Sequence, residues 1–203
     1  AFERVCAVVA EGAEIVDIGG IKAAPGVEIG EAEEKARVVD FVARVRAEHP
    51  GLVISVDTWR AGVADAVCAA GADLIFTNAR WIDLESTEGA PYNFSLLDEK
   101  AAAAESAGME LVVLFDHSPN WALINTTYPR SPIKADKYTA LVNVVSALAT
   151  RYNGNNGHPR INYWLFYGEP DNIYSGWGNN GNEYGDMLAM VSPVIKAANP
   201  MAK

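Results

Sequence analysis

The chain has 203 residues, of which 50% are hydrophobic and 21% are charged, a composition typical of a globular domain with a substantial core. Its formal net charge of −10 argues against nucleic acid or an anionic membrane as a partner, because both would repel the chain. No apolar stretch reaches membrane-spanning length and the first residues lack the pattern of a signal peptide, so we expect a soluble protein.

Strands and helices are predicted to alternate along the chain. Short apolar runs rich in β-branched residues indicate strands, and stretches with apolar residues at helical spacing indicate helices between them. The expected strands cover 14–20, 52–57, 73–78, 109–116 and 161–167, and the expected helices cover 2–9, 31–48, 60–70, 95–108, 138–152 and 184–195. Gly12 and Pro50 stand where the first two helices are expected to end.

This alternation predicts an α/β fold with a parallel sheet, because parallel strands need helical crossovers and no short hairpin turns are present. An eight-stranded barrel of this kind takes about 250 residues, so five strands predict a single domain with an incomplete or hybrid TIM-type barrel. Missing strands would leave sheet edges exposed, which predicts self-association of the chain.

Polar side chains follow the expected strands at their C-terminal ends. They are Asp17, Asp57, Asn78, Asp116, His117 and Glu169. Right-handed crossovers place these ends on one side of the sheet, where parallel α/β proteins build their active sites. Asp57 also has a simpler explanation, as a helix N-cap together with Thr58.

Glu169 is the first candidate catalytic residue, because it follows a buried strand and stands between Gly168 and Pro170. Carboxylate catalysis on a sugar needs a second carboxyl group, about 5 Å away in a retaining pair. Asp116 at the end of the preceding strand is the candidate for that group. His117 could position a substrate hydroxyl or carry a proton, and it could equally be a hydrogen-bonded structural histidine.

No metal or cofactor is expected. The three histidines lie far apart in sequence, and Cys6 and Cys68 lack the spacing of metal ligands and are expected to be small buried thiols. Neither a phosphate-binding loop nor a dinucleotide fingerprint is present.

Residues 1–75 resemble dihydropteroate synthase and its pterin-binding relatives, and we assign a pterin-binding-like segment to 1–77. The resemblance is carried by 13–20 (AEIVDIGG), the Pro25-Gly26 loop, 54–58 (ISVDT) and 69–75 (AAGADLI). It implies a pterin ligand that is hydrogen-bonded by Asp57, with Asp17 as a second binding residue.

Residues 78–203 resemble a clan of retaining glycoside hydrolases with the same (β/α)₈ barrel. The matching segments are 80–83 (RWID), 92–95 (YNFS), 118–121 (SPNW) and 164–171 (WLFYGEPD). The resemblance implies that Glu169 is the acid/base, whereas the clan's nucleophile belongs to a seventh strand. Aromatic faces stack on pyranose rings, so the expected substrate-binding residues are His117, Trp121, Trp164, Tyr167, Asp171 and Trp177.

The first functional expectation is therefore a glycoside hydrolase-like barrel segment that binds an oligosaccharide and, if it turns over, acts as a retaining hydrolase. One alternative is a pterin-binding protein of the dihydropteroate synthase type with a small-molecule ligand. The other is a recombined or engineered barrel, chimeric between the two families, without an activity of its own.

Overall fold

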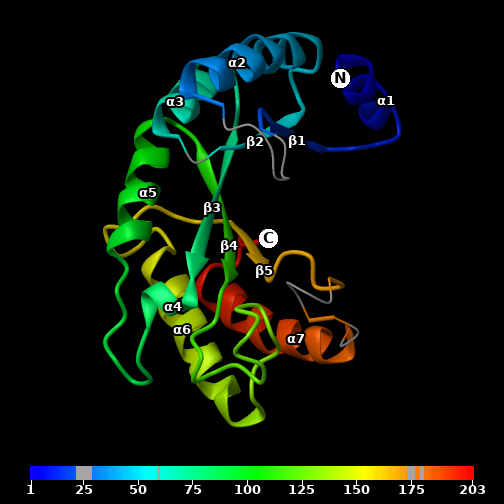
Figure 1. The fold of residues 1–203 in the computed structure, drawn as a ribbon. Helices are drawn as coiled ribbons and strands as arrows, with labels where there is room; N and C mark the ends of the chain where they lie inside the picture. The colour runs from blue at the N-terminus through cyan, green and yellow to red at the C-terminus, as the bar shows by residue number, and fades with distance from the viewer. Residues whose placement is uncertain (22–28, 59, 173–176, 179–180) are drawn as a thin grey trace. The chain divides into compact units, whose positions relative to one another are not determined.

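A computed structural model of the chain describes residues 1–21, 29–58, 60–172, 177–178 and 181–203. Its strands are β1 (Ile15–Gly19), β2 (Val53–Asp57), β3 (Leu74–Arg80), β4 (Glu110–Asp116) and β5 (Tyr163–Phe166) (Figure 1). Its helices are α1 (Phe2–Ala10), α2 (Glu31–Glu48), α3 (Ala61–Ala69), α4 (Trp81–Leu84), α5 (Ser95–Ser106), α6 (Tyr138–Arg151) and α7 (Gly181–Ala198), and a 3₁₀ turn covers Ala135–Lys137. The Pro25-Gly26 loop lies outside the described residues.

The strands form one sheet in the order β1-β2-β3-β4-β5, and β1 with β2, β2 with β3 and β4 with β5 pair in parallel. This confirms the predicted α/β fold with parallel β/α units. The third strand is longer than expected, so Asn78 lies within β3 and not at its end. The short helix α4 follows that strand directly and was not predicted.

The residues group into two compact units. The first unit contains Ala1–Phe76 and Ala103–Leu111, and the second contains Thr77–Ala102 and Val112–Lys203. None of the helices in the described ranges combines the length and the apolar character needed to cross a bilayer.

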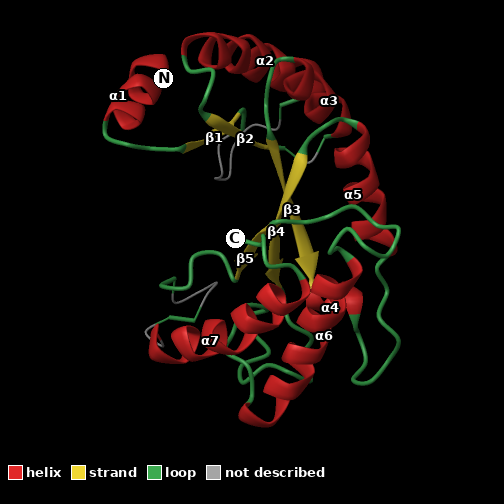
Figure 2. Ribbon diagram, turned by 180° about the vertical axis from the view of Figure 1, so that it is seen from behind, coloured by secondary structure: helices red, strands yellow, loops and turns green. Residues whose placement is uncertain are grey.

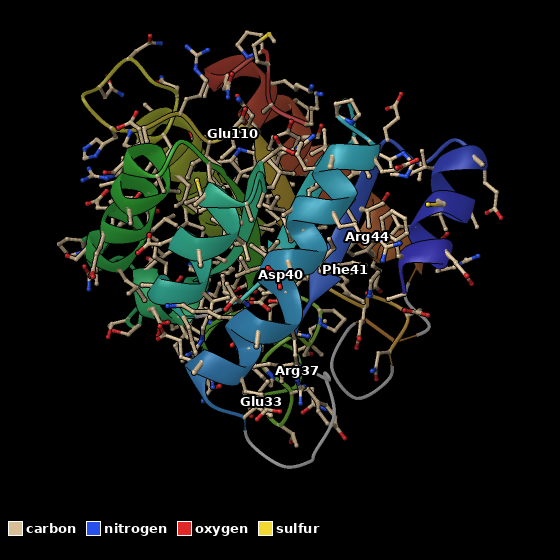
Figure 3. All side chains as sticks on the ribbon, turned by 90° about the horizontal axis from the view of Figure 1, so that it is seen from above. Glu33, Arg37, Asp40, Phe41, Arg44 and Glu110 are labelled. Atoms are coloured by element: carbon tan, nitrogen blue, oxygen red, sulfur yellow. The ribbon has the colours of Figure 1, made fainter. Side chains whose placement is uncertain are left out.

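The first unit has its core between β2 and the helices α2 and α3. Val38, Val42 and Val45 recur at helical spacing on α2 and are almost completely buried. They belong to one apolar cluster with Ile54 of β2 and Val67 of α3. The opposite side of α2 carries exposed charges, among them Glu33, Arg37, Asp40 and Arg44 (Figure 3). This amphipathic pattern explains why α2 covers the sheet at the site described below.

Arg46 fastens the C-terminal end of α2 to the segments that precede β2 and β3. Its guanidinium donates to the carbonyl oxygens of Leu52 at 2.8 Å and Gly71 at 3.0 and 2.8 Å, and it pairs with Asp73. Asp73 in turn accepts from the Ile54 amide at 2.8 Å. Gly71 has φ +103°, and a Cβ there would lie 2.9 Å from the Arg46 side chain, so both conformation and space require glycine.

The second unit contains the packed helix pair α6 and α7 (Figure 2) and a group of aromatic rings in tilted and edge-to-face contact. Phe115 of β4 contacts Trp81 at a ring-centroid distance of 6.0 Å and Tyr167 at 6.2 Å. Tyr167 meets Trp177 edge to face at 5.5 Å. Beside β5, the Lys203 amide donates to Asn162 at 2.6 Å and the Trp164 amide donates to Lys203 at 3.1 Å. Lys203 therefore occupies part of the edge of β5.

Candidate functional site

Two of the predicted site residues, Asp17 and Asp57, lie together in the first unit. Asp17 pairs in register with Ser55, and Gly19 pairs with Asp57, the last residue of β2. Side chains alternate along a strand, so Asp57 lies on the same face as Ser55 and therefore on the same face as Asp17. Both aspartates are solvent-accessible. The parallel register thus presents two carboxyl groups on one face of neighbouring strands, with Asp17 in the middle of β1 and Asp57 at the C-terminal end of β2.

The surroundings of Asp57 make its charged form costly. Partial desolvation of its carboxyl group, and next the negative charges of Asp17 and Glu34, raise the pKa of Asp57 above the ordinary aspartate value. A carboxyl group in this setting gains when a ligand offers it hydrogen-bond donors, since a carboxylate accepts several hydrogen bonds. Perturbed carboxyl groups of this kind are typical of functional sites.

Glu34 and Arg60 form an ion pair next to this carboxylate pair, and sequence reasoning missed both. Glu34 is 1% exposed, although it is charged. Its partner Arg60 also donates to the carbonyl oxygen of Ile29 at 2.7 Å. A signal for Glu34 existed in the sequence: it lies four residues before Val38, on the apolar face of α2, where a charge is out of place.

The role of Asp57 as a helix N-cap is not seen. Helix α3 begins at Ala61 with Arg60 in the N-cap position, and no side chain among the described residues caps it. Thr58 instead accepts a hydrogen bond from the Arg60 amide through its hydroxyl group at 3.2 Å. The carboxylate of Asp57 thus does not cap helix α3.

The second glycine of the Gly19-Gly20 pair is required by helix packing. A Cβ at Gly20 would lie 2.8 Å from a methyl group of Val38 and 3.0 Å from the Cγ atom of Glu34. Arg37 of α2 also donates to the Gly20 carbonyl oxygen at 3.1 Å. Close approach of α2 to the end of β1 therefore explains this glycine without a role in ligand binding.

Asp116 and His117 meet at the end of β4, in the second unit. Asp116 is fully buried, and its Oδ2 accepts from Arg130 at 3.0 Å through Nε and lies 2.9 Å from Nη2. His117 Nδ1 lies 2.7 Å from the other carboxylate oxygen. The predicted catalytic Asp116 is thus held in a buried ion pair, and Arg130, fourteen residues away in sequence, gave no pattern that could identify it.

Glu169 is exposed beyond the end of β5. Its carboxylate accepts from the Asn172 side chain at 3.2 Å, and the following Asp171 is also exposed. Glu169, His117 and Tyr167 have φ values of 54°, 49° and 46°, in the left-handed region. Such conformations cost energy in residues other than glycine and often mark functional segments.

The predicted aromatic binding residues are mostly part of the core of the second unit. Tyr167, Trp177 and Trp164 are 0%, 1% and 9% exposed. Burial raises the pKa of Tyr167 beyond its ordinary range, and its hydroxyl group lies 2.6 Å from that of Ser118. Trp121 is half-buried and packs edge to face on Trp81 at 5.3 Å. The ring faces expected to stack on a sugar are occupied by neighbouring side chains.

In the ranges that the structure describes, no three metal-ligating side chains come together.

Comparison with known proteins identifies the family. A family model described as "Pterin binding enzyme" matches residues 1–116. The inactive dihydropteroate synthase 2 of Mycobacterium tuberculosis (strain ATCC 25618 / H37Rv) is 52% identical over 73 residues, 36% of this chain and 22% of that protein. The dihydropteroate synthase of Bacillus subtilis (strain 168) is 47% identical over 66 residues, 32% of this chain and 23% of that protein. The matched part is less than a quarter of either relative.

Solved structures show the same fold at low identity. The Yersinia pestis dihydropteroate synthase with a pterine-sulfa conjugate aligns with 97% of this chain and 63% of that one, at TM-score 0.56 and 21% identity. A family 39 glycoside hydrolase from Bacteroides cellulosilyticus WH2 aligns with 73% of this chain and 30% of that one, at TM-score 0.55 and 16% identity. At these identities both likenesses concern the fold alone.

The expectation of a glycoside hydrolase that binds an oligosaccharide is therefore wrong. The pterin-binding family model continues past residue 77, where the hydrolase-like segment was expected to begin, and includes all of β4 up to Asp116. The error has a physical origin, because both families place carboxylates and aromatic residues at the ends of parallel strands in one fold, and short motifs there look alike. The part of the chain from Ala1 to Asp116 carries the signature of one family, and the chain belongs to the pterin-binding enzymes.

Proposed function

We propose that this chain is a dihydropteroate synthase-like protein that binds a pterin at the C-terminal ends of β1 and β2. The observation that carries the proposal is Asp57, an accessible carboxylate at the end of β2 in the part that the family model matches. The Yersinia pestis enzyme with the same fold was solved with a pterine-sulfa conjugate, which supports this class of ligand.

The chemistry of the two aspartates fits a pterin. A pterin ring carries an amino group next to a ring N–H, and a carboxylate can accept hydrogen bonds from both at once. Asp57 is the expected acceptor, and Asp17 on the same face of the strand pair is the second. Without a ligand, the Asp57 carboxylate has lost part of its hydration. Hydrogen bonds from the pterin ring would compensate for that loss.

The proposal concerns binding and not synthesis. The mycobacterial relative, which is more similar than the Bacillus enzyme, is named an inactive dihydropteroate synthase. The chain also matches less than a quarter of each of these proteins, so we assign it the ligand class of the family and no reaction.

The site is assigned to the first compact unit. That unit ends its first segment at Phe76, close to the boundary at residue 77 expected from sequence.

The test is a fluorescence titration of the chain with pterin at neutral pH. Asp57→Asn keeps one acceptor oxygen and loses one charge-assisted hydrogen bond, worth about 1.5–3 kcal/mol, so we expect roughly ten- to hundredfold weaker binding. Asp40→Asn makes the same change on the exposed side of α2 and should bind like the unaltered chain. Equal binding by both variants, or no binding by the unaltered chain, would contradict the proposal.

A further inference from the structure

A buried ion pair connects the segment after Asp57 to helix α2. The Glu34 carboxylate is 1% exposed, and the side chain of Arg60, its partner, is 14% exposed. The second carboxylate oxygen of Glu34 accepts no hydrogen bond from the described residues. A buried carboxylate depends on its cation, because removing one partner leaves an uncompensated charge. Arg60 therefore supplies the positive charge that compensates the buried Glu34 carboxylate.

Arg60 reaches three parts of the unit from one position. Its guanidinium pairs with Glu34 and donates to the Ile29 carbonyl oxygen just before α2, and its backbone amide donates to the Thr58 hydroxyl group. Thr58 is 5% exposed and follows Asp57 directly. These contacts connect Thr58 and Arg60 to the start of α2.

Among the described residues, the charged groups that act on Asp57 come from two elements. Asp17 faces it from β1 and Glu34 from α2, and both are negative. Of the basic residues of α2 near this end, Lys35 pairs with Glu31 at 2.7 Å, and Arg37 pairs with Glu33 at 2.5 Å and donates to the Gly20 carbonyl oxygen at 3.1 Å. Arg60 is the cation that pairs with Glu34, so it compensates the Glu34 charge.

We propose that Arg60 is a positioning residue of the pterin site, which holds and neutralises Glu34 and thereby sets the pH range in which Asp57 binds its ligand as a carboxylate. The inference rests on the proposed function, because it takes Asp57 as the pterin ligand. The raised pKa of Asp57, to which Glu34 contributes, supports it. Without the arginine, the Glu34 charge would shift binding toward higher pH.

The test follows the dissociation constant for pterin from pH 4 to 7. Glu34→Gln removes a negative charge that acts on Asp57 and keeps the Arg60 guanidinium, so the acid midpoint of binding should fall by about one pH unit, about tenfold in Kd on the acid side. Arg60→Lys keeps the charge and should retain the midpoint of the unaltered chain. Glu31→Gln, the same change on the same helix at an exposed position, is the control and should leave the midpoint unchanged.

The double variant Glu34→Gln with Arg60→Gln removes both charges without leaving either one buried alone. Its midpoint should lie between those of the unaltered chain and Glu34→Gln, because the cation that lowers the midpoint is gone. If the double variant has the same acid midpoint as Glu34→Gln, the role of Arg60 is overturned. If the acid midpoint does not change in Glu34→Gln, the inference as a whole is overturned.

A second readout separates this inference from the proposed function. The titration of the Asp57 carboxyl carbon, followed by NMR in the free protein, needs no ligand and should shift to lower pH in Glu34→Gln. If the unaltered chain does not bind pterin while this titration shifts, the proposed function fails and the electrostatic coupling stands. If pterin binds and neither readout responds to Glu34→Gln, the coupling fails and the proposed function stands.

Discussion

Two aspartates of this chain show how opposite surroundings give one residue type two roles. Asp98 accepts from Arg151 at 2.8 and 2.7 Å and from the Tyr152 hydroxyl group at 2.8 Å, and the Arg151 hydrogen bonds are the main cause that lowers its pKa. Asp57 is partly desolvated and has carboxylates for neighbours, and both effects raise its pKa. The first arrangement stabilises the fold at neutral pH, and the second leaves a carboxylate that gains from a ligand.

Asp57 should therefore lower the stability of the free protein at neutral pH. Its raised pKa means that the native state holds a proton at pH values where the unfolded chain has lost it. Stability then falls as pH rises from about 4, the ordinary aspartate value, through the native pKa. We expect Asp57→Asn to have a higher Tm than the unaltered chain at pH 7 and an equal Tm at pH 3. A variant with a lower Tm at pH 7 would show that the carboxylate stabilises the fold.

At the scale of the element, both ends of helix α2 are fixed to the strands, and its N-terminal half lies beside the site. Its N-terminal half packs Glu34 and Val38 against Gly20, and its C-terminal half carries Arg46, which binds the segments before β2 and β3. The apolar stripe of the helix, read from sequence, predicts only that the helix covers the sheet. The Arg46 contacts depend on loops that are distant in sequence and come together in space. The spacing of apolar residues along the helix therefore cannot predict them.

Arg46→Lys should destabilise the first unit although it keeps the charge. Lysine lacks the planar guanidinium, so it cannot donate at once to the carbonyl oxygens of Leu52 and Gly71 and to the Asp73 carboxylate. We therefore expect the free energy of unfolding to fall by about 1–3 kcal/mol. Arg44→Lys is the matched control, because Arg44 lies on the same helix (Figure 3) and stacks on the Phe2 ring at 3.8 Å, a contact that lysine can also make. Urea unfolding of both variants compares them, and equal losses would contradict the role given to the fork.

At the scale of the whole molecule, the sequence predicts the fold better than the site. The five strands follow from apolar runs such as 52–57 and 109–116, whose burial is a local signal. Trp164, Tyr167 and Trp177 were expected to contact a ligand, because a ring beside a strand-end carboxylate looks the same in sequence whether it meets a ligand or another ring. The pairing of Asp116 with Arg130 could not be predicted either, since it depends on how a loop returns to β4.

The order of the strands places β1 and β5 at the two ends of the sheet, and each carries a large exposed apolar side chain. Ile15 is 50% exposed on β1, and Leu165 is 48% exposed on β5. Unpaired strand edges pair readily with other chains, and exposed apolar groups add to the gain on association. We therefore expect the average molar mass of the chain to rise with concentration.

Ile15→Lys and Leu165→Lys should each reduce this association, because a charge on a terminal strand opposes pairing with a second chain. Leu96→Lys is the control, since Leu96 is 56% exposed but lies on helix α5. Light scattering coupled to size-exclusion chromatography, run over a range of concentrations, measures the difference. If Leu96→Lys lowers the average mass as much as the strand variants do, the contact is a general apolar one and not an edge-to-edge pairing. A chain that stays monomeric throughout would show instead that both edges are protected, as Lys203 already does for part of β5.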